Sequence, residues 1–154
     1  MTLPNLRDYH LPDTVDEAIA LLRQFGDGAA LVAGGSFVHG LEVRGLLEGV
    51  TALIDIQRLG LGGIRREGES VLIGATTTFT ELAAADFVRT GPFCGAVRDA
   101  LTHPPRQIRN VGTVGGCIAA SAPLYDLPAA LLALGGGVRT IGANGSRELP
   151  LDGF

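Results

Sequence analysis

Lysine is absent from the sequence and cysteine is scarce. All 12 basic residues are arginine, they are scattered along the chain, and the net charge is −4. A nucleic-acid-binding protein presents clustered basic residues, so this pattern argues against a nucleic-acid partner. The two cysteines, Cys94 and Cys117, have no metal-ligand or Cys-x-x-Cys spacing. We therefore expect two buried free thiols, with no zinc or iron–sulfur site in this chain.

Long apolar runs are also missing. No run approaches the roughly 20 residues that cross a bilayer, and the first eight residues show no basic-then-apolar signal pattern. These absences predict a cytoplasmic protein with no membrane span. The length of 154 residues and the apolar share of 46% are those of an ordinary globular domain.

The first half of the sequence predicts short strands alternating with helices. Thr14 and Glu17 form a capping box that begins a helix, and Gly26 is placed to end it. A short helix is expected after residues 36–40. Extended segments are predicted at residues 8–11, at 29–32 as a buried strand, and at 52–56. This order indicates a small βαβ lobe.

The second half predicts hairpins, helices and a glycine-rich loop. Thr78 and Glu81 form another capping box, and Leu127 to Leu134 carry an apolar helical stripe. The segment 106–126, rich in small residues, is expected to be a loop that ends in a helix start. The other elements are predicted as a hairpin of 62–66 with 70–74, a helix over 92–101, and a hairpin of 138–143 with 146–149 around an Asn144-Gly145 turn.

Two glycine pairs mark the candidate site. Gly34-Gly35 follows a predicted strand, and Gly115-Gly116 lies in the segment 106–126. Such glycines let the backbone approach a partner closely, and the partner is either a bound nucleotide or a neighbouring element of the chain. Their amides can also hold a phosphate. The spacing matches neither Gly-x-Gly-x-x-Gly nor a P-loop.

Acid–base machinery is not evident. Asp126 is placed either as the N-cap of the following helix or as a ligand-binding carboxylate. His39 and His103 are isolated, so neither a hydrolytic triad nor a metal site is predicted. Arg106 and Arg109 flank the glycine-rich segment and belong either to a surface face or to the site.

With these residues in view, the sequence resembles the FAD-binding medium subunit of the molybdenum hydroxylases, the family of bacterial carbon monoxide dehydrogenases and of the xanthine dehydrogenase flavin domain. The likeness rests on Ala33-Gly34-Gly35-Ser36 and on the run from His103-Pro104 to Gly115-Gly116. Pro123 and the segment 126–131 extend it. So does the opening pattern of Tyr9, Pro12, Thr14, Glu17 and Ala18.

The resemblance implies a two-lobed α+β fold of the PCMH type, similar to vanillyl-alcohol oxidase. Residues 1–75 would form the N-terminal βαβ lobe, and residues 76–154 would form an incomplete second lobe. Family members continue beyond the equivalent of Phe154 and add a C-terminal domain, so this chain is expected to be a shortened form.

The resemblance also implies a cofactor site. Residues 33–38 would hold the FAD pyrophosphate, residues 113–117 would close from the second lobe, Asp126 would hydrogen-bond the cofactor, and His103 would lie near the flavin. Cys117 departs from the usual polar residue, which questions one contact, and Gly115→Val is expected to abolish FAD binding by filling the space beside the cofactor. The implied residues are Ala33, Gly34, Gly35, Ser36, Phe37, Val38, His103, Ile108, Thr113, Gly115, Gly116, Cys117 and Asp126.

The implied function is electron transfer. An iron–sulfur small subunit would pass electrons from [2Fe–2S] centres to FAD, having received them from a molybdopterin large subunit, and FAD would pass them to an external acceptor. A cofactor that carries the chemistry needs no catalytic acid or base from this chain. Two alternatives stay open: a non-catalytic remnant that docks or binds a nucleotide, and a free-standing flavin enzyme related to the enolpyruvyl-sugar reductases.

Overall fold

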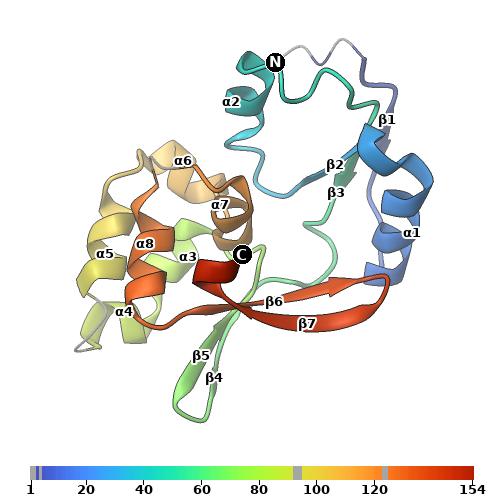
Figure 1. Ribbon diagram of the computed structural model, residues 1–154. Coiled ribbons are helices and arrows are strands. Elements are labelled where there is room, and N and C mark those ends of the chain that lie inside the picture. Colours follow the sequence, from blue (N-terminus) through green and yellow to red (C-terminus); the bar gives the residue numbers. More distant parts are fainter. Residues whose placement is uncertain (1–2, 4, 92–94, 123–124) are drawn as a thin grey trace.

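The computed structural model describes residues 3, 5–91, 95–122 and 125–154, with the backbone alone for His39. Expectations for Pro92, Cys94 and Pro123 therefore lie outside the described residues. Figure 1 shows an N-terminal lobe of strands and helices, a second lobe of short helices, and β hairpins below them.

The N-terminal lobe is the predicted βαβ unit. Its sheet has the order β1-β3-β2, and both pairings are parallel. The central strand β3 is buried along its whole length, so it forms the core of this lobe. The strands are β1 (Asp8–His10), β2 (Ala29–Val32) and β3 (Ala52–Asp55), and the helices are α1 (Val15–Phe25), η1 (Gly26–Gly28) and α2 (Val38–Val43).

Local chemistry sets the ends of α1. The Thr14 side chain accepts from the Glu17 backbone N–H at 3.1 Å, and Gly26 ends the helix with a positive φ of 51°, which glycine adopts readily. The Glu17 carboxylate accepts from Asp13 instead of Thr14, so the predicted capping box is only half formed. The prediction of a buried β2 was also wrong, because Leu31 is half exposed.

The second lobe is helical. Its apolar core gathers Leu82, Val88, Val97 and Leu101, each at most 1% exposed, and burial of such side chains stabilises a fold by about 1.5–3 kcal/mol each. The predicted capping box at Thr78 is complete, with both reciprocal bonds to Glu81. The helices are α3 (Phe79–Ala84), α4 (Asp86–Thr90), α5 (Gly95–Thr102), α6 (Arg106–Val111), α7 (Val114–Ala120) and α8 (Asp126–Ala133).

The expected loop over 106–126 was wrong, because most of it forms α6 and α7. Thr113 caps α7 by accepting from the Gly116 N–H at 3.2 Å. Glycine-rich sequences have low helix propensity, and here neighbouring segments supply the missing stabilisation. The N-cap of α8 is Tyr125, so Asp126 is the first helical residue and not the cap.

Two antiparallel hairpins complete the fold. One joins β4 (Ile64–Glu67) to β5 (Ser70–Ile73), and the other joins β6 (Gly137–Gly142) to β7 (Gly145–Pro150), followed by η2 (Leu151–Gly153). The second turn is Ala143-Asn144, one residue earlier than predicted, because Gly145 already pairs with Gly142. The β6–β7 hairpin extends beneath both lobes toward α1 (Figure 1), where Arg23 donates to Ala143 at 3.5 Å.

The residues that the structure describes contain neither a candidate membrane-spanning helix nor a candidate metal site. None of their helices is long and apolar enough to cross a membrane. None of their His, Cys, Asp and Glu side chains gather in threes where a metal could bind.

Candidate functional site

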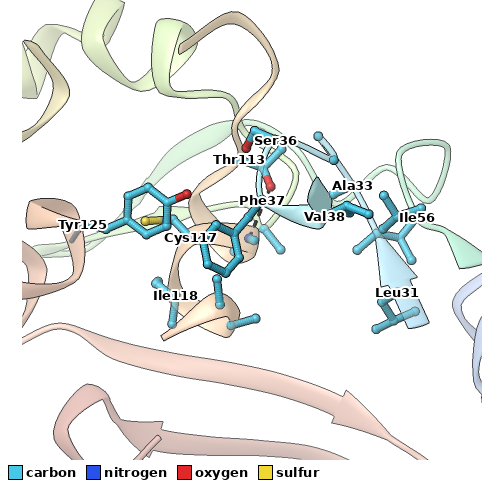
Figure 2. A pocket seen from close by; sticks show the side chains of 18 of the residues that line it. Leu31, Ala33, Ser36, Phe37, Val38, Ile56, Thr113, Cys117, Ile118 and Tyr125 are labelled. Atoms are coloured by element: carbon cyan, nitrogen blue, oxygen red, sulfur yellow. Dashed lines mark hydrogen bonds between the residues drawn. The ribbon is translucent and has the colours of Figure 1, made fainter. Parts of the chain in front are cut away.

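A cavity of about 440 Å³ lies where the two lobes face each other. The loop after β2, the helix α7 and the strand β6 all contribute to its wall. In Figure 2, Tyr125 and Cys117 lie at one end, Val38, Ile56 and Leu31 lie at the other, and Ser36 lies beside Thr113 between them. Segments far apart in the sequence therefore build one space.

A second cavity, of about 480 Å³, adjoins the first. The two share Ser36, Phe79, Cys117 and Tyr125 in their walls. The residues predicted from the sequence divide between them. Those lining the first are Ala33, Gly34, Gly35, Ser36, Phe37, Val38, Thr113, Gly115, Gly116 and Cys117, and those lining the second include His103, Ile108 and Asp126.

The loop after β2 offers unpaired backbone donors. Across the described residues, the N–H groups of Gly34, Gly35, Ser36 and Phe37 donate no hydrogen bond. Gly35 has φ of 64°, and a left-handed residue in such a turn lets successive N–H groups converge on one point. We name residues 33–37 the amide loop. Its free donors suit an anionic group such as a phosphate.

The start of α7 differs, since its amides are already used. Val114 donates to the Thr77 carbonyl and Gly115 to the Ala75 carbonyl, both at 2.9 Å. Gly116 donates to the Thr113 side chain. The sequence predicted that the amides of residues 113–116 could hold a phosphate, but in the structure those of Val114, Gly115 and Gly116 are bonded within the chain. In this structure α7 supplies a wall of small residues to the cavity.

Close packing within the chain explains why glycine is needed at one position of each glycine pair. A Cβ atom on Gly34 would overlap the carbonyl oxygen of Val111, and one on Gly115 would lie 2.7 Å from the Cβ of Ala75. Of the two explanations left open by the sequence, a neighbouring element accounts for both positions. A valine at Gly115 would thus disturb the contact between α7 and Ala75, so loss of FAD would not by itself locate the cofactor.

An aromatic pair spans the two lobes at the shared wall. The rings of Phe37 and Tyr125 are 5.6 Å apart and meet edge to face, and the Arg44 guanidinium lies 5.1 Å from the Phe37 ring centre. Tyr125 was not among the predicted site residues. Its position directly before Asp126 was the available signal.

Cys117 lies buried beside this pair. Burial raises the pKa of its thiol from 9.0 to about 11, so the thiol is neutral at physiological pH. Burial, followed by the nearby Cys117, also raises the pKa of Tyr125. A neutral thiol is a poor nucleophile, which favours a packing role for Cys117.

The first cavity has little charge. Among its described lining residues, the only ionised side chain is that of Arg139, whose Nη2 pairs with Glu148 at 2.7 Å. Leu31, Leu41 and Ile56 add apolar surface. The first cavity can therefore hold an anionic group at the amide loop and a flat apolar group against its walls.

Comparison with known proteins gives consistent matches along the chain. A family model described as "FAD binding domain in molybdopterin dehydrogenase" matches residues 4–154. The carbon monoxide dehydrogenase medium chain of Hydrogenophaga pseudoflava is 39% identical over 155 residues, which cover 99% of this chain and 53% of that protein. The 6-hydroxypseudooxynicotine dehydrogenase complex subunit alpha of Paenarthrobacter nicotinovorans is 36% identical over 147 residues, which cover 94% and 48%.

Solved structures agree. Carbon monoxide dehydrogenase from Hydrogenophaga pseudoflava, in a form lacking the Mo-pyranopterin moiety, matches with a TM-score of 0.89 and 38% identity, over 100% of this chain and 53% of that one. The chain thus spans about half the length of the relatives it matches.

Proposed function

The chain belongs to the family of FAD-binding domains of molybdopterin dehydrogenases, and from this premise we propose that it is the FAD-holding, electron-transferring part of a molybdenum hydroxylase complex. Membership confirms the resemblance seen in the sequence and the PCMH-type α+β fold. FAD is the cofactor that this family binds. The division of the chain near residue 76 stays a prediction.

The observation that carries the proposal is the amide loop beside an apolar cavity. A pyrophosphate needs several donors within a short distance, and Gly34 to Phe37 supply four N–H groups without partners among the described residues. A flavin ring needs a flat apolar wall, for which Ile118 and Tyr125 are placed. The residues present therefore fit FAD.

Each predicted residue has a role in this proposal. Ala33 to Val38 bind the pyrophosphate, while Thr113 and Gly115 to Cys117 form the facing wall. His103, Ile108 and Asp126 line the second cavity, and a bound cofactor that extends into it meets them there. We assign none of them an acid–base step.

FAD, when bound, supplies the redox chemistry by accepting and releasing electrons. The chain's own contribution is to hold the cofactor and shield it. We propose that the electrons come from an iron–sulfur small subunit and that a molybdopterin large subunit acts on the substrate. This follows relatives named as medium chains or complex subunits.

Titration of the purified chain with FAD tests the proposal. We expect one FAD per chain, seen as a change in flavin fluorescence and as visible absorption that stays with the protein on gel filtration. In a second step, mixing the loaded chain with its reduced iron–sulfur subunit should bleach the flavin absorption. A chain that takes up no FAD, alone or with its partner subunits, would overturn the proposal and favour the docking remnant.

A further inference from the structure

A side-chain network ties the amide loop to the core of the N-terminal lobe. Asp55, the last residue of β3, is 5% exposed. Its carboxylate accepts from the Tyr9 hydroxyl at 2.5 Å and from the Gln57 backbone N–H at 2.9 Å. The side-chain amide of Gln57 donates to the carbonyl oxygen of Ala33 at 2.8 Å and to Asp55 Oδ2 at 3.3 Å. Gln57 thus connects a buried carboxylate to the first residue of the loop.

The orientation of the Gln57 amide follows from its neighbours. Both groups it contacts, the Ala33 carbonyl and the Asp55 carboxylate, are acceptors. An amide oxygen in that place would face two other oxygens, so the NH₂ group must lie there. Gln57 consequently acts on Ala33 as a donor.

This bond fixes the direction of the next amide. The carbonyl of Ala33 and the N–H of Gly34 belong to one planar trans peptide, in which they point in opposite directions. A donor that holds the Ala33 oxygen therefore turns the Gly34 N–H away from Gln57. Gly34 lines the first cavity, whereas Gln57 is not among its lining residues. The constraint thus turns the first of the four free amides away from Gln57, in a residue that lines the cavity.

We propose that Gln57 is a positioning residue for the amide loop. Asp55 and Tyr9 hold its side chain, Gln57 holds the Ala33 carbonyl, and the peptide between Ala33 and Gly34 is fixed in the orientation that an anion needs. This role rests on the proposed function, because it concerns how the amide loop binds the phosphates of FAD. Gln57 itself touches no phosphate in this account.

The Gln57 side chain can be changed without removing core packing. It is solvent-exposed, and its backbone bond to Asp55 does not depend on the side chain. Gln57→Ala removes the donor, while Gln57→Glu keeps the size and presents oxygen to oxygen. Gln24→Ala is a matched control, since Gln24 is an exposed glutamine on α1, outside the walls of both cavities.

The experiment measures the Kd for FAD and the thermal midpoint of all four proteins. Loss of one positioned hydrogen bond should weaken FAD binding by about tenfold in Gln57→Ala, and further in Gln57→Glu. The midpoint should stay close to that of the parent chain. In the cofactor-free protein, the Gly34 amide signal in a ¹H–¹⁵N spectrum should move in both Gln57 variants and stay unchanged in Gln24→Ala.

The outcomes separate the two proposals. If the parent chain binds no FAD, the proposed function fails and the inference falls with it. If the parent chain binds FAD and both Gln57 variants bind it equally well, the inference alone is overturned. Weaker binding that merely follows a lowered thermal midpoint, with an unmoved Gly34 signal, would also overturn it.

Discussion

Gly34 meets Val111 backbone to backbone, with no room for a side chain between the amide loop and the end of α6. The contact joins the loop after β2 to the end of α6, and Gly34 also lines the first cavity. The sequence offered Gly34 as a ligand-binding residue, but packing against Val111 already requires glycine at this position. The amide loop can face the cavity only because Gly34 permits this approach.

Gly34→Ala should disrupt the contact between the lobes. The added methyl group would overlap the Val111 carbonyl, and relief requires movement of backbone on one side, at a cost of about 1–3 kcal/mol or more. We expect a lower thermal midpoint together with weaker FAD binding. Gly49→Ala is the control, because a Cβ there has nothing within 4 Å and φ is not positive. Equal midpoints for the two variants would contradict the close approach.

The capping box at Thr78 gives a prediction about stability. Thr78 accepts from the Glu81 N–H and donates to its carboxylate, and the next residue, Phe79, donates its N–H to Gly112 just before α7. Thr78→Ala should destabilise the chain by about 1 kcal/mol, which lowers the thermal midpoint by a few degrees. Thr90→Ala, at the end of α4, loses only the bond from the Thr90 hydroxyl to the Asp86 carbonyl and should lower the thermal midpoint less. A smaller loss in Thr78→Ala than in Thr90→Ala would argue against the cap.

Local signals explain which parts of the fold were predictable. The cap at Thr14, the box at Thr78 and the glycine end of α1 act within a few residues, so the sequence located these helix ends. The order of extended segments and a capped helix likewise predicted the βαβ lobe. Such features depend on neighbouring residues alone.

The missed features depend on distant contacts. The helix α7 is stabilised by the Gly115 N–H donating to the carbonyl of Ala75, a residue 40 positions away. No local sequence pattern predicts that bond. The same bond removes the amide that a free turn would have offered to a ligand. Tyr125 lines both cavities, and its ring contact with Phe37 depends on how distant segments meet.

The contact between Phe37 and Tyr125 should be measurable as a coupling energy. Edge-to-face pairs contribute about 0.5–1.5 kcal/mol beyond buried area, so a double-mutant cycle with Phe37→Leu and Tyr125→Leu should return a coupling in that range. Tyr125→Phe keeps the ring and should unfold like the parent chain. Denaturant unfolding of the parent chain, the two leucine variants and the double variant gives the coupling energy. Strictly additive losses in the free energy of unfolding would show that the rings do not interact.

Cys117 should react slowly and only at high pH. With a pKa of about 11 instead of 9.0, its thiolate fraction near pH 8 is about a hundredfold below that of a free thiol, and burial slows access further. In a Cys94→Ser background, which leaves one thiol, the rate of iodoacetamide modification should rise with each pH unit toward about 11. FAD should slow the reaction, because Cys117 lines both cavities.

The same pKa sets the direction of a stability change. Above pH 9 the unfolded chain loses the Cys117 proton first, while the folded chain keeps it until about pH 11. The unfolded state then binds fewer protons, so the free energy of unfolding falls as pH rises through this window, and the contribution is fully present below pH 9. Replacing Cys117 by Ala in the same background should flatten that part of the curve. A Cys117 that is modified as fast as free cysteine at pH 8, with no effect of FAD, would place its thiol outside the cavity wall.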